Sequence, residues 1–206
     1  MSIATSPAAK AASLACSVVL FTLAACGGGG EAPPDETKAE APTERALARP
    51  TPPGGTVIDA DCRLKGFASL ALQRINSYRA SGATCGERGT FAPTTPLAWN
   101  AALIASSTRL SKDMAANNFF SHIGSDGSDL VQRVNDVGYV WYALGENIAA
   151  GQRTVNDVVD AWMSSSAHCA SIMEPMFRDV GLACVKGNRQ DTYSTYWTMD
   201  FGANVQ

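Results

Sequence analysis

The chain has 206 residues, with 16 basic and 19 acidic side chains and a net charge of −3. This length fits one domain plus a tail, and the nearly balanced charge argues against nucleic acid as a partner. Hydrophobic residues make up 46% of the sequence and include four tryptophans and seven phenylalanines, which excludes disorder of the whole chain. The composition is that of a compact domain and indicates no function.

Residues 1–25 have the features of an export signal. Lys10 is the only charged residue before an apolar stretch from Ala11 to Ala25, which is too short to span a bilayer comfortably. The end of this stretch, Leu23-Ala24-Ala25-Cys26-Gly27, resembles the lipobox of bacterial lipoproteins, in which Cys26 carries the lipid. The alternative is an ordinary cleaved signal in which Cys26 has no role.

Residues 26–57 differ in composition from the rest of the chain. Four glycines, Gly27 to Gly30, lead into a segment rich in Pro, Glu, Ala and Thr that has almost no large apolar residue. Such a segment cannot bury enough surface to offset its ordering entropy. We expect a lipidated tether that holds a folded domain, residues 58–206, at a membrane of the bacterial cell envelope, facing an extracytoplasmic compartment.

Four cysteines remain in the folded part: Cys62, Cys85, Cys169 and Cys184. In an oxidising compartment they predict two disulfides, for which three pairings are possible. We predict the pairing between sequence neighbours, Cys62–Cys85 and Cys169–Cys184. A zinc site built from all four thiols is the alternative, although no C-x-x-C pair supports it.

Hydrophobic periodicity predicts both helices and strands. Asp126 or Ser128 is the expected N-cap of the third helix, and Thr154 to Asp157 resembles a capping box for the fourth. Helices are expected at residues 67–82, 98–117, 130–138 and 154–162. Residues 180–185 and 193–201 alternate as a β-hairpin, and the run from Tyr139 to Leu144 is expected to form a further strand. The pattern predicts an α+β fold, a small antiparallel sheet covered by helices.

The chain contains two histidines, His122 and His168, and Glu146 lies between them in the sequence. Each is expected at the end of a predicted element, where scaffolds often present functional side chains. The three residues are therefore a candidate joint site. The alternative is two capping histidines and one surface carboxylate. Arg133 is expected on the polar face of its helix, paired with a nearby carboxylate and with no part in the chemistry, and Asn147 is expected to bind the backbone beside Glu146.

Three motifs occur in order along the folded part: Phe-Ser-His-x-Gly-Ser-Asp-Gly-Ser at 120–128, Gly-Glu-Asn-Ile-Ala at 145–149 and Trp-x-x-Ser-x-x-His at 162–168. Together with the aromatic strand at 196–202, they resemble the CAP superfamily, the SCP/PR-1 type of domain in its bacterial secreted form. The resemblance covers roughly residues 66–204. It implies an α-β-α sandwich with a surface cleft, in which two His and two Glu of many members can bind a divalent metal.

The family's cleft residues match this chain at three positions, His122, Glu146 and His168. The second glutamate falls on Ser165, which leaves the acidic pair incomplete. Two imidazoles and one carboxylate suit a three-ligand site for a divalent metal such as zinc, with one position open to water. Without metal, Glu146 would hold one imidazole in a chosen tautomer and raise its pKa.

Two functions follow from these residues. The first is a lipid-anchored binding module whose cleft recognises an unknown envelope or extracellular ligand. The second is a metal-assisted hydrolase acting on peptide or envelope polymer, with His122, Glu146 and His168 around the ion. A serine hydrolase using Ser121, Ser165 or Ser166 is disfavoured, because the chain has no Gly-x-Ser-x-Gly nucleophile elbow. The low charge density and the incomplete acidic pair favour the binding module.

Overall fold

The structure is a computed structural model that describes residues 4–5 and 60–204. The predicted lipidation site Cys26, the tether at 26–57 and all of the predicted signal peptide except Ala4–Thr5 lie outside the described residues. Within the described part, no helix is long and apolar enough to cross a membrane.

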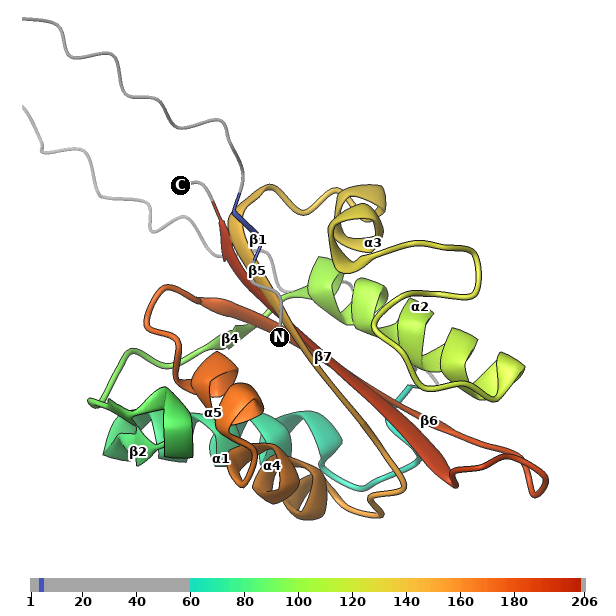
Figure 1. Cartoon of the computed structure of the whole chain (residues 1–206), viewed down its shortest axis with the longest axis horizontal. Helices are drawn as coiled ribbons and strands as arrows, with labels where there is room; N and C mark the ends of the chain where they lie inside the picture. Colours follow the sequence, from blue (N-terminus) through green and yellow to red (C-terminus); the bar gives the residue numbers. More distant parts are fainter. Residues whose placement is uncertain (1–3, 6–59, 205–206) are drawn as a thin grey trace, which may run out of the picture. The chain divides into compact units, whose positions relative to one another are not determined.

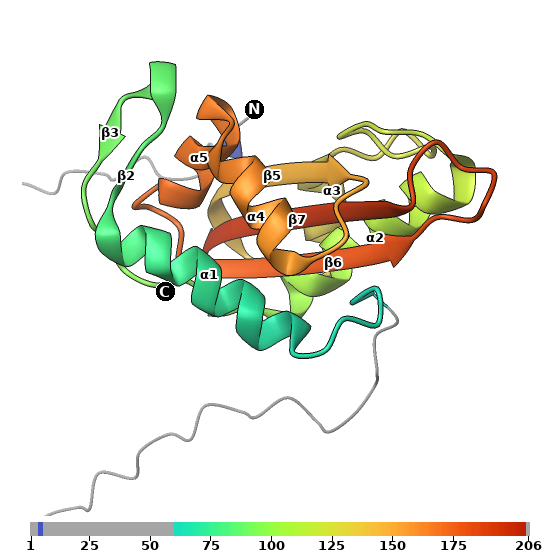
Figure 2. The same cartoon turned by 90° about the horizontal axis from the view of Figure 1, so that it is seen from below.

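A β-sheet lies between two layers of helices (Figures 1 and 2). Helix α2 packs across β6 and β7 on one face of the sheet, next to α3, while α1, α4 and α5 pack together over the other face. The helices are α1 (Phe67–Ser81), α2 (Ala101–Asn117), α3 (Leu130–Asp136), α4 (Val155–Met163) and α5 (Ser166–Met173). The α-β-α sandwich implied by the resemblance is confirmed.

The centre of the sheet is antiparallel, as the sequence predicts. Its strands are β5 (Trp141–Ala150), β7 (Thr195–Asn204) and β6 (Asp179–Lys186), in the order β1-β5-β7-β6-β4. The predicted hairpin is therefore β6 and β7. At the edges, β1 (Ala4–Thr5) pairs antiparallel with β5, and β4 (Ala98–Trp99) pairs parallel with β6. The sheet is thus mixed rather than purely antiparallel. A separate two-stranded sheet, β2 (Ala83–Thr84) and β3 (Thr90–Phe91), flanks the 3-10 helix Gly86–Arg88.

The start of the second helix was predicted too early. Ala98 and Asn100 donate their backbone N–H groups to carbonyls of Arg178 and Val180, so this segment extends the sheet. Helix α2 begins only after Asn100, whose side chain accepts hydrogen bonds from the first turn of the helix. The apolar periodicity alone does not show that these backbone groups bond to another strand.

The predicted cap of the third helix is also wrong, whereas that of the fourth is confirmed. Asp129 caps α3 by accepting from the N–H of Gln132 at 2.8 Å. Asp126 lies earlier in the loop and pairs with an arginine of α2 instead. Thr154 caps α4 by accepting from the N–H of Asp157 at 3.1 Å.

Two elements that carry site residues differ from the prediction. Strand β5 begins at Trp141 rather than Tyr139 and continues to Ala150, so Glu146 lies within a strand and not at the end of one. Helix α5 was not predicted, and it carries His168. Trp162, Trp197 and Tyr139 are all buried in the core.

The predicted disulfide pairing is wrong. The bonds join Cys62 to Cys184 and Cys85 to Cys169, with Cα–Cα distances of 5.2 and 5.4 Å. The partners are 122 and 84 residues apart, because the fold brings the segment at Cys62 against β6 and the segment at Cys85 against α5. Closing loops of this length stabilises the fold by about 4.5–5 kcal/mol per bond in the chain-entropy treatment.

Candidate functional site

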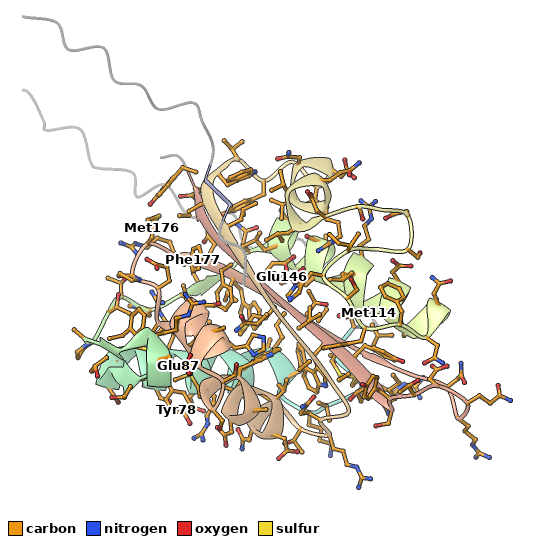
Figure 3. All side chains as sticks on the ribbon, in the orientation of Figure 1. Tyr78, Glu87, Met114, Glu146, Met176 and Phe177 are labelled. Atoms are coloured by element: carbon orange, nitrogen blue, oxygen red, sulfur yellow. A yellow bond between two sulfur atoms is a disulfide. The ribbon has the colours of Figure 1, made fainter. Side chains whose placement is uncertain are left out.

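Glu146 lies at the centre of a buried ion-pair cluster between the helical layers (Figure 3). Its Oε1 atom is 2.6 Å from Nδ1 of His122, and its Oε2 atom accepts from Nη2 of Arg133 at 2.7 Å. Arg133 and Glu146 are buried, whereas the His122 side chain is 47% exposed. The expected pairing of Arg133 with a carboxylate is confirmed, but its expected place on a polar helix face is wrong, because the pair lies on the buried side of α3.

This cluster selects one tautomer of His122. Arg133 is a permanent cation 2.7 Å from Oε2 of Glu146, and a carboxylate can only accept hydrogen bonds. The hydrogen between His122 and Glu146 is therefore carried by Nδ1. In the neutral ring, Nε2 is then the atom with the free lone pair. The His122 side chain is the more exposed member of the cluster.

Arg133 also fixes the loop that carries His122. Its Nη1 atom donates to the backbone carbonyls of Ser128 and His122, at 2.8 and 3.2 Å. One buried guanidinium thus binds the Glu146 side chain and the backbone of the His122 loop at the same time. The relative position of the imidazole and the carboxylate is set by this residue, which sequence analysis did not include in the site.

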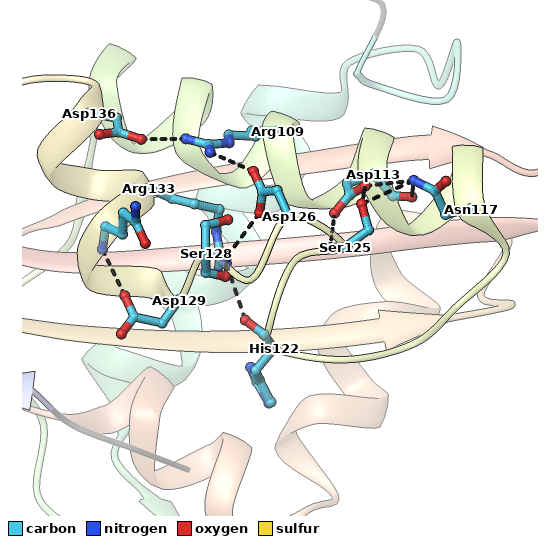
Figure 4. A network of polar contacts seen from close by, with 11 residues as sticks. Arg109, Asp113, Asn117, His122, Ser125, Asp126, Ser128, Asp129, Arg133 and Asp136 are labelled. Atoms are coloured by element: carbon cyan, nitrogen blue, oxygen red, sulfur yellow. Dashed lines mark hydrogen bonds and ion pairs between the residues drawn. The ribbon is translucent and has the colours of Figure 1, made fainter.

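A second set of polar contacts ties the same loop to α2 (Figure 4). Asp113 of α2 accepts from both the backbone N–H and the hydroxyl of Ser125, each at 2.6 Å. Arg109 of α2 pairs with Asp126 and Asp136, at 2.8 and 2.6 Å. Hydrogen bonds from Ser128 and Arg109 lower the pKa of Asp126, so this carboxylate is charged at neutral pH. The loop before α3 is therefore held by side chains of α2 as well as by Arg133.

His168 lies on α5, on the other side of β5. Its backbone carbonyl accepts from Nδ2 of Asn147 at 3.1 Å, so the expected backbone contact of Asn147 reaches another element rather than its own segment. Burial lowers the pKa of His168, and the charge of His122 lowers it further. The two imidazoles are therefore within electrostatic reach of each other, and His168 is neutral at pH 7.

A disulfide and a set of hydrogen bonds hold α5 in place. The Cys85–Cys169 disulfide is attached at the residue after His168. The buried Arg79 of α1 donates to the backbone carbonyls of Ile172 and Glu174 at the end of α5, at 2.7 and 3.0 Å. Burial lowers the pKa of Arg79 to about 10, which leaves it charged at neutral pH. His168 is therefore carried by a firmly attached helix.

A pocket of about 320 Å³ opens beside His168. Its walls come from the last residues of β5, Ile148–Ala150, from Ala161 and Trp162 of α4, and from two aromatic residues of flanking loops. Ser165 lines the pocket together with His168, which agrees with the expectation that it stands near the cleft. Neither His122 nor Glu146 is among the lining residues.

Asp200 is a further buried acid that sequence analysis missed. It lies on β7 directly opposite Glu146 of β5, and its side chain is fully buried. Neither of its carboxyl oxygens has a hydrogen-bond partner in the described part of the chain. Burial, and then the charge of Glu146, raise the pKa of Asp200 well above its usual range. A single aspartate among the buried aromatic and apolar residues of 196–201 is the sequence signal that marks it.

The described residues include no group of three or more His, Cys, Asp or Glu side chains that could hold a metal ion. Glu146 already uses one oxygen for His122 and the other for Arg133. A three-ligand site with Glu146 as a direct ligand therefore does not fit this arrangement. The carboxylate instead has the geometry of a residue that orients an imidazole.

The domain is an α-β-α sandwich in which the buried Glu146–Arg133 pair lies beside His122. Residues 72–201, more than half of the chain, match the family described as CAP, the cysteine-rich secretory protein family. The chain belongs to this family.

Relatives include the uncharacterized protein YkwD of Bacillus subtilis (strain 168), which is 32% identical over 106 residues. That match covers 52% of this chain and 39% of YkwD, so the chain spans about two fifths of the length of this relative.

Two solved structures show the same fold. An outer surface protein from Borrelia burgdorferi has a TM-score of 0.56 at 17% identity, covering 66% of this chain and 92% of that protein. An extracellular protein containing a SCP domain from Bacillus anthracis str. Ames has a TM-score of 0.51 at 22% identity, covering 66% of this chain and 41% of that protein.

Proposed function

We propose that this protein is a lipid-anchored, extracytoplasmic binding protein of a bacterial cell envelope whose ligand occupies the pocket beside His168. The pocket carries the proposal, because its volume of about 320 Å³ lies at the lower end of the range of small-ligand sites. The two buried disulfides support an oxidising compartment. The similar structures, described as an extracellular protein and an outer surface protein, support the same location.

A pocket variant with a matched control tests the binding function. Ala161 is an exposed residue of α4 that lines the pocket, and Asn156 is an exposed residue of the same helix that does not. We expect Ala161→Trp to obstruct the pocket and Asn156→Trp to leave it open. Saturation-transfer NMR of the full chain in detergent, with a panel of small uncharged fragments, measures the difference. Equal binding to both variants and to the wild type would place the bound fragments elsewhere and contradict the proposal.

The same cleft is proposed to hold a divalent metal through two imidazoles, His122 and His168. Support comes from the Nδ1 contact of His122 with Glu146, which leaves Nε2 free, as in carboxylate-oriented metal-binding histidines. Elemental analysis of the full chain after dialysis against zinc is the test. We expect bound zinc in the wild type and its loss in both His122→Ala and His168→Ala. Zinc retained in both variants would exclude this pair as the ligands.

The hydrolase alternative depends on the same two imidazoles. When bound, a divalent metal supplies an activated water for hydrolysis. Cleavage of a peptide or an envelope polymer by the wild type, lost in His122→Ala and in His168→Ala alike, would favour the hydrolase over the binding module. Binding to the pocket without turnover would favour the binding module.

A further inference from the structure

We propose that the pocket beside His168 binds an uncharged aromatic ring, carried either by a peptide side chain or by a free aromatic compound. This inference rests on the proposed binding function and names the ligand class of the same site. Three features of the pocket support it: two aromatic side chains in its lining, the hydrogen bonds that join the loops carrying them, and the charge and size of the lining.

Two partly exposed aromatic rings line the pocket. Phe120, in the loop after α2, and Tyr193, in the loop before β7, both line the pocket while remaining 46% and 37% exposed. Their ring centroids are 5.9 Å apart at an interplanar angle of 58°, and Tyr193 meets the buried Tyr196 edge-on at 5.9 Å and 89°. Such tilted rings offer both faces and edges, which is the arrangement that a further aromatic ring prefers.

The two loops that carry these rings are joined before any ligand binds. Asn118 ends α2 in the left-handed region, with a φ of 49°. Its Oδ1 atom accepts from the backbone N–H of Thr192 at 2.8 Å and from the hydroxyl of Tyr196 at 3.1 Å. Because the neighbours of both Phe120 and Tyr193 are thereby held together, ligand binding needs little additional ordering of these loops.

The charge and size of the lining select the kind of ring. Among the described residues, no Asp, Glu, Lys or Arg lines the pocket. A charged ligand would lose hydration there without gaining a counter-charge. Ile148, Ala149 and Ala161 supply a low apolar wall. A volume of about 320 Å³ suits a group of one or two rings rather than a larger ligand.

Capped amino acids and a simple phenol test this inference on the full chain in detergent. The probes are N-acetyl-L-phenylalaninamide, N-acetyl-L-leucinamide and p-cresol, titrated at pH 7 and followed by NMR. We expect saturable binding of the phenylalanine amide and weaker binding of the leucine amide. Tighter binding of the capped amide than of p-cresol would indicate a peptide as the source of the ring, and the reverse order a free aromatic compound.

Leucine variants separate the ring from its hydrophobic area. We expect Phe120→Leu and Tyr193→Leu to weaken phenylalanine-amide binding roughly three- to tenfold each. Tyr193→Phe keeps the ring and should bind like the wild type. Tyr142→Leu is the matched control, because Tyr142 is an equally exposed tyrosine, at 41%, that does not line the pocket.

The outcomes distinguish this inference from the proposed function. If both amides bind equally and Ala161→Trp abolishes both, the pocket is a binding site but the preference for aromatic rings is wrong. If the leucine variants bind the phenylalanine amide like the wild type, the preference is also wrong. If no probe binds to the wild type, the inference is overturned. The fragment panel and the comparison of Ala161→Trp with Asn156→Trp then decide whether the pocket binds at all.

Discussion

Replacing Arg133 by methionine tests the role of the buried cluster most sharply. Methionine keeps an unbranched apolar stem but is shorter and lacks the guanidinium. Glu146, which is almost fully buried, then loses the cation that lies 2.7 Å from its Oε2 atom. The backbone carbonyls of Ser128 and His122 also lose their shared donor.

The expected cost follows from the burial of both partners. Removing one member of a buried ion pair leaves an uncompensated charge and typically costs about 3–5 kcal/mol. For a domain of this size, each kcal/mol lowers the melting temperature by roughly 2–4 °C. We therefore expect Arg133→Met to lower the melting temperature by roughly 6–20 °C, measured by thermal and urea unfolding of the full chain with its disulfides intact.

Arg109→Met provides the control. Arg109 also pairs with two carboxylates, Asp126 and Asp136, but its side chain is 38% exposed and theirs are about half exposed. Exposed pairs contribute about 0–1 kcal/mol, so this variant should unfold close to the wild type. Adding Glu146→Gln to Arg133→Met should recover part of the loss, because the unpaired charge is removed. Equal losses of stability in Arg133→Met and Arg109→Met would contradict the expected effect of burial on the ion pair.

Three further predictions concern Asp200, the disulfides and the anchor. Burial raises the pKa of Asp200, so the unfolded chain releases this proton at lower pH than the folded protein does. Wild-type stability should therefore fall as pH rises above the ordinary aspartate value of about 3.9, and Asp200→Asn should remove this part of the decline in urea unfolding measured across pH. Replacing Cys85 and Cys169 together by serine should lower the free energy of unfolding by up to about 4.6 kcal/mol, while non-reducing peptide mapping of the wild type recovers the Cys85–Cys169 bond. Mass spectrometry of the membrane fraction should find an acylated N-terminal Cys26, and a Cys26→Ala protein that remains anchored would contradict the lipid anchor.

Local patterns in the sequence predict most of the helices and the β6–β7 hairpin. The cap at Thr154 and the glycine after α1 depend on residues that lie close together in the sequence. A short stretch of sequence is therefore enough to predict these helix ends. Strand β5 is harder to predict, because it is buried along most of its length and lacks the alternation of a half-exposed strand. Its true extent is what places Glu146 inside the sheet.

Contacts between distant segments could not be predicted from local patterns. Cys62 pairs with Cys184 across 122 residues, and only the completed sheet brings them together. Arg133 has the spacing of an ordinary helix residue, and its burial depends on Glu146 of β5. The motif residues His122, Glu146 and His168 were identified, but the residue that positions two of them, Arg133, becomes evident only from the structure.

The two histidines offer the most direct test of the account. In the full chain labelled with ¹⁵N-histidine, the ring nitrogens of His122 and His168 give two sets of signals that His122→Ala assigns. We expect His122 to carry its hydrogen on Nδ1. We also expect the pKa of His168 to lie below the ordinary histidine value of about 6.5. Adding N-acetyl-L-phenylalaninamide should shift the His168 signals in the wild type but not in Ala161→Trp. A His122 ring with its hydrogen on Nε2 alone would contradict the cluster, and His168 signals that do not respond to the probe would contradict the binding pocket.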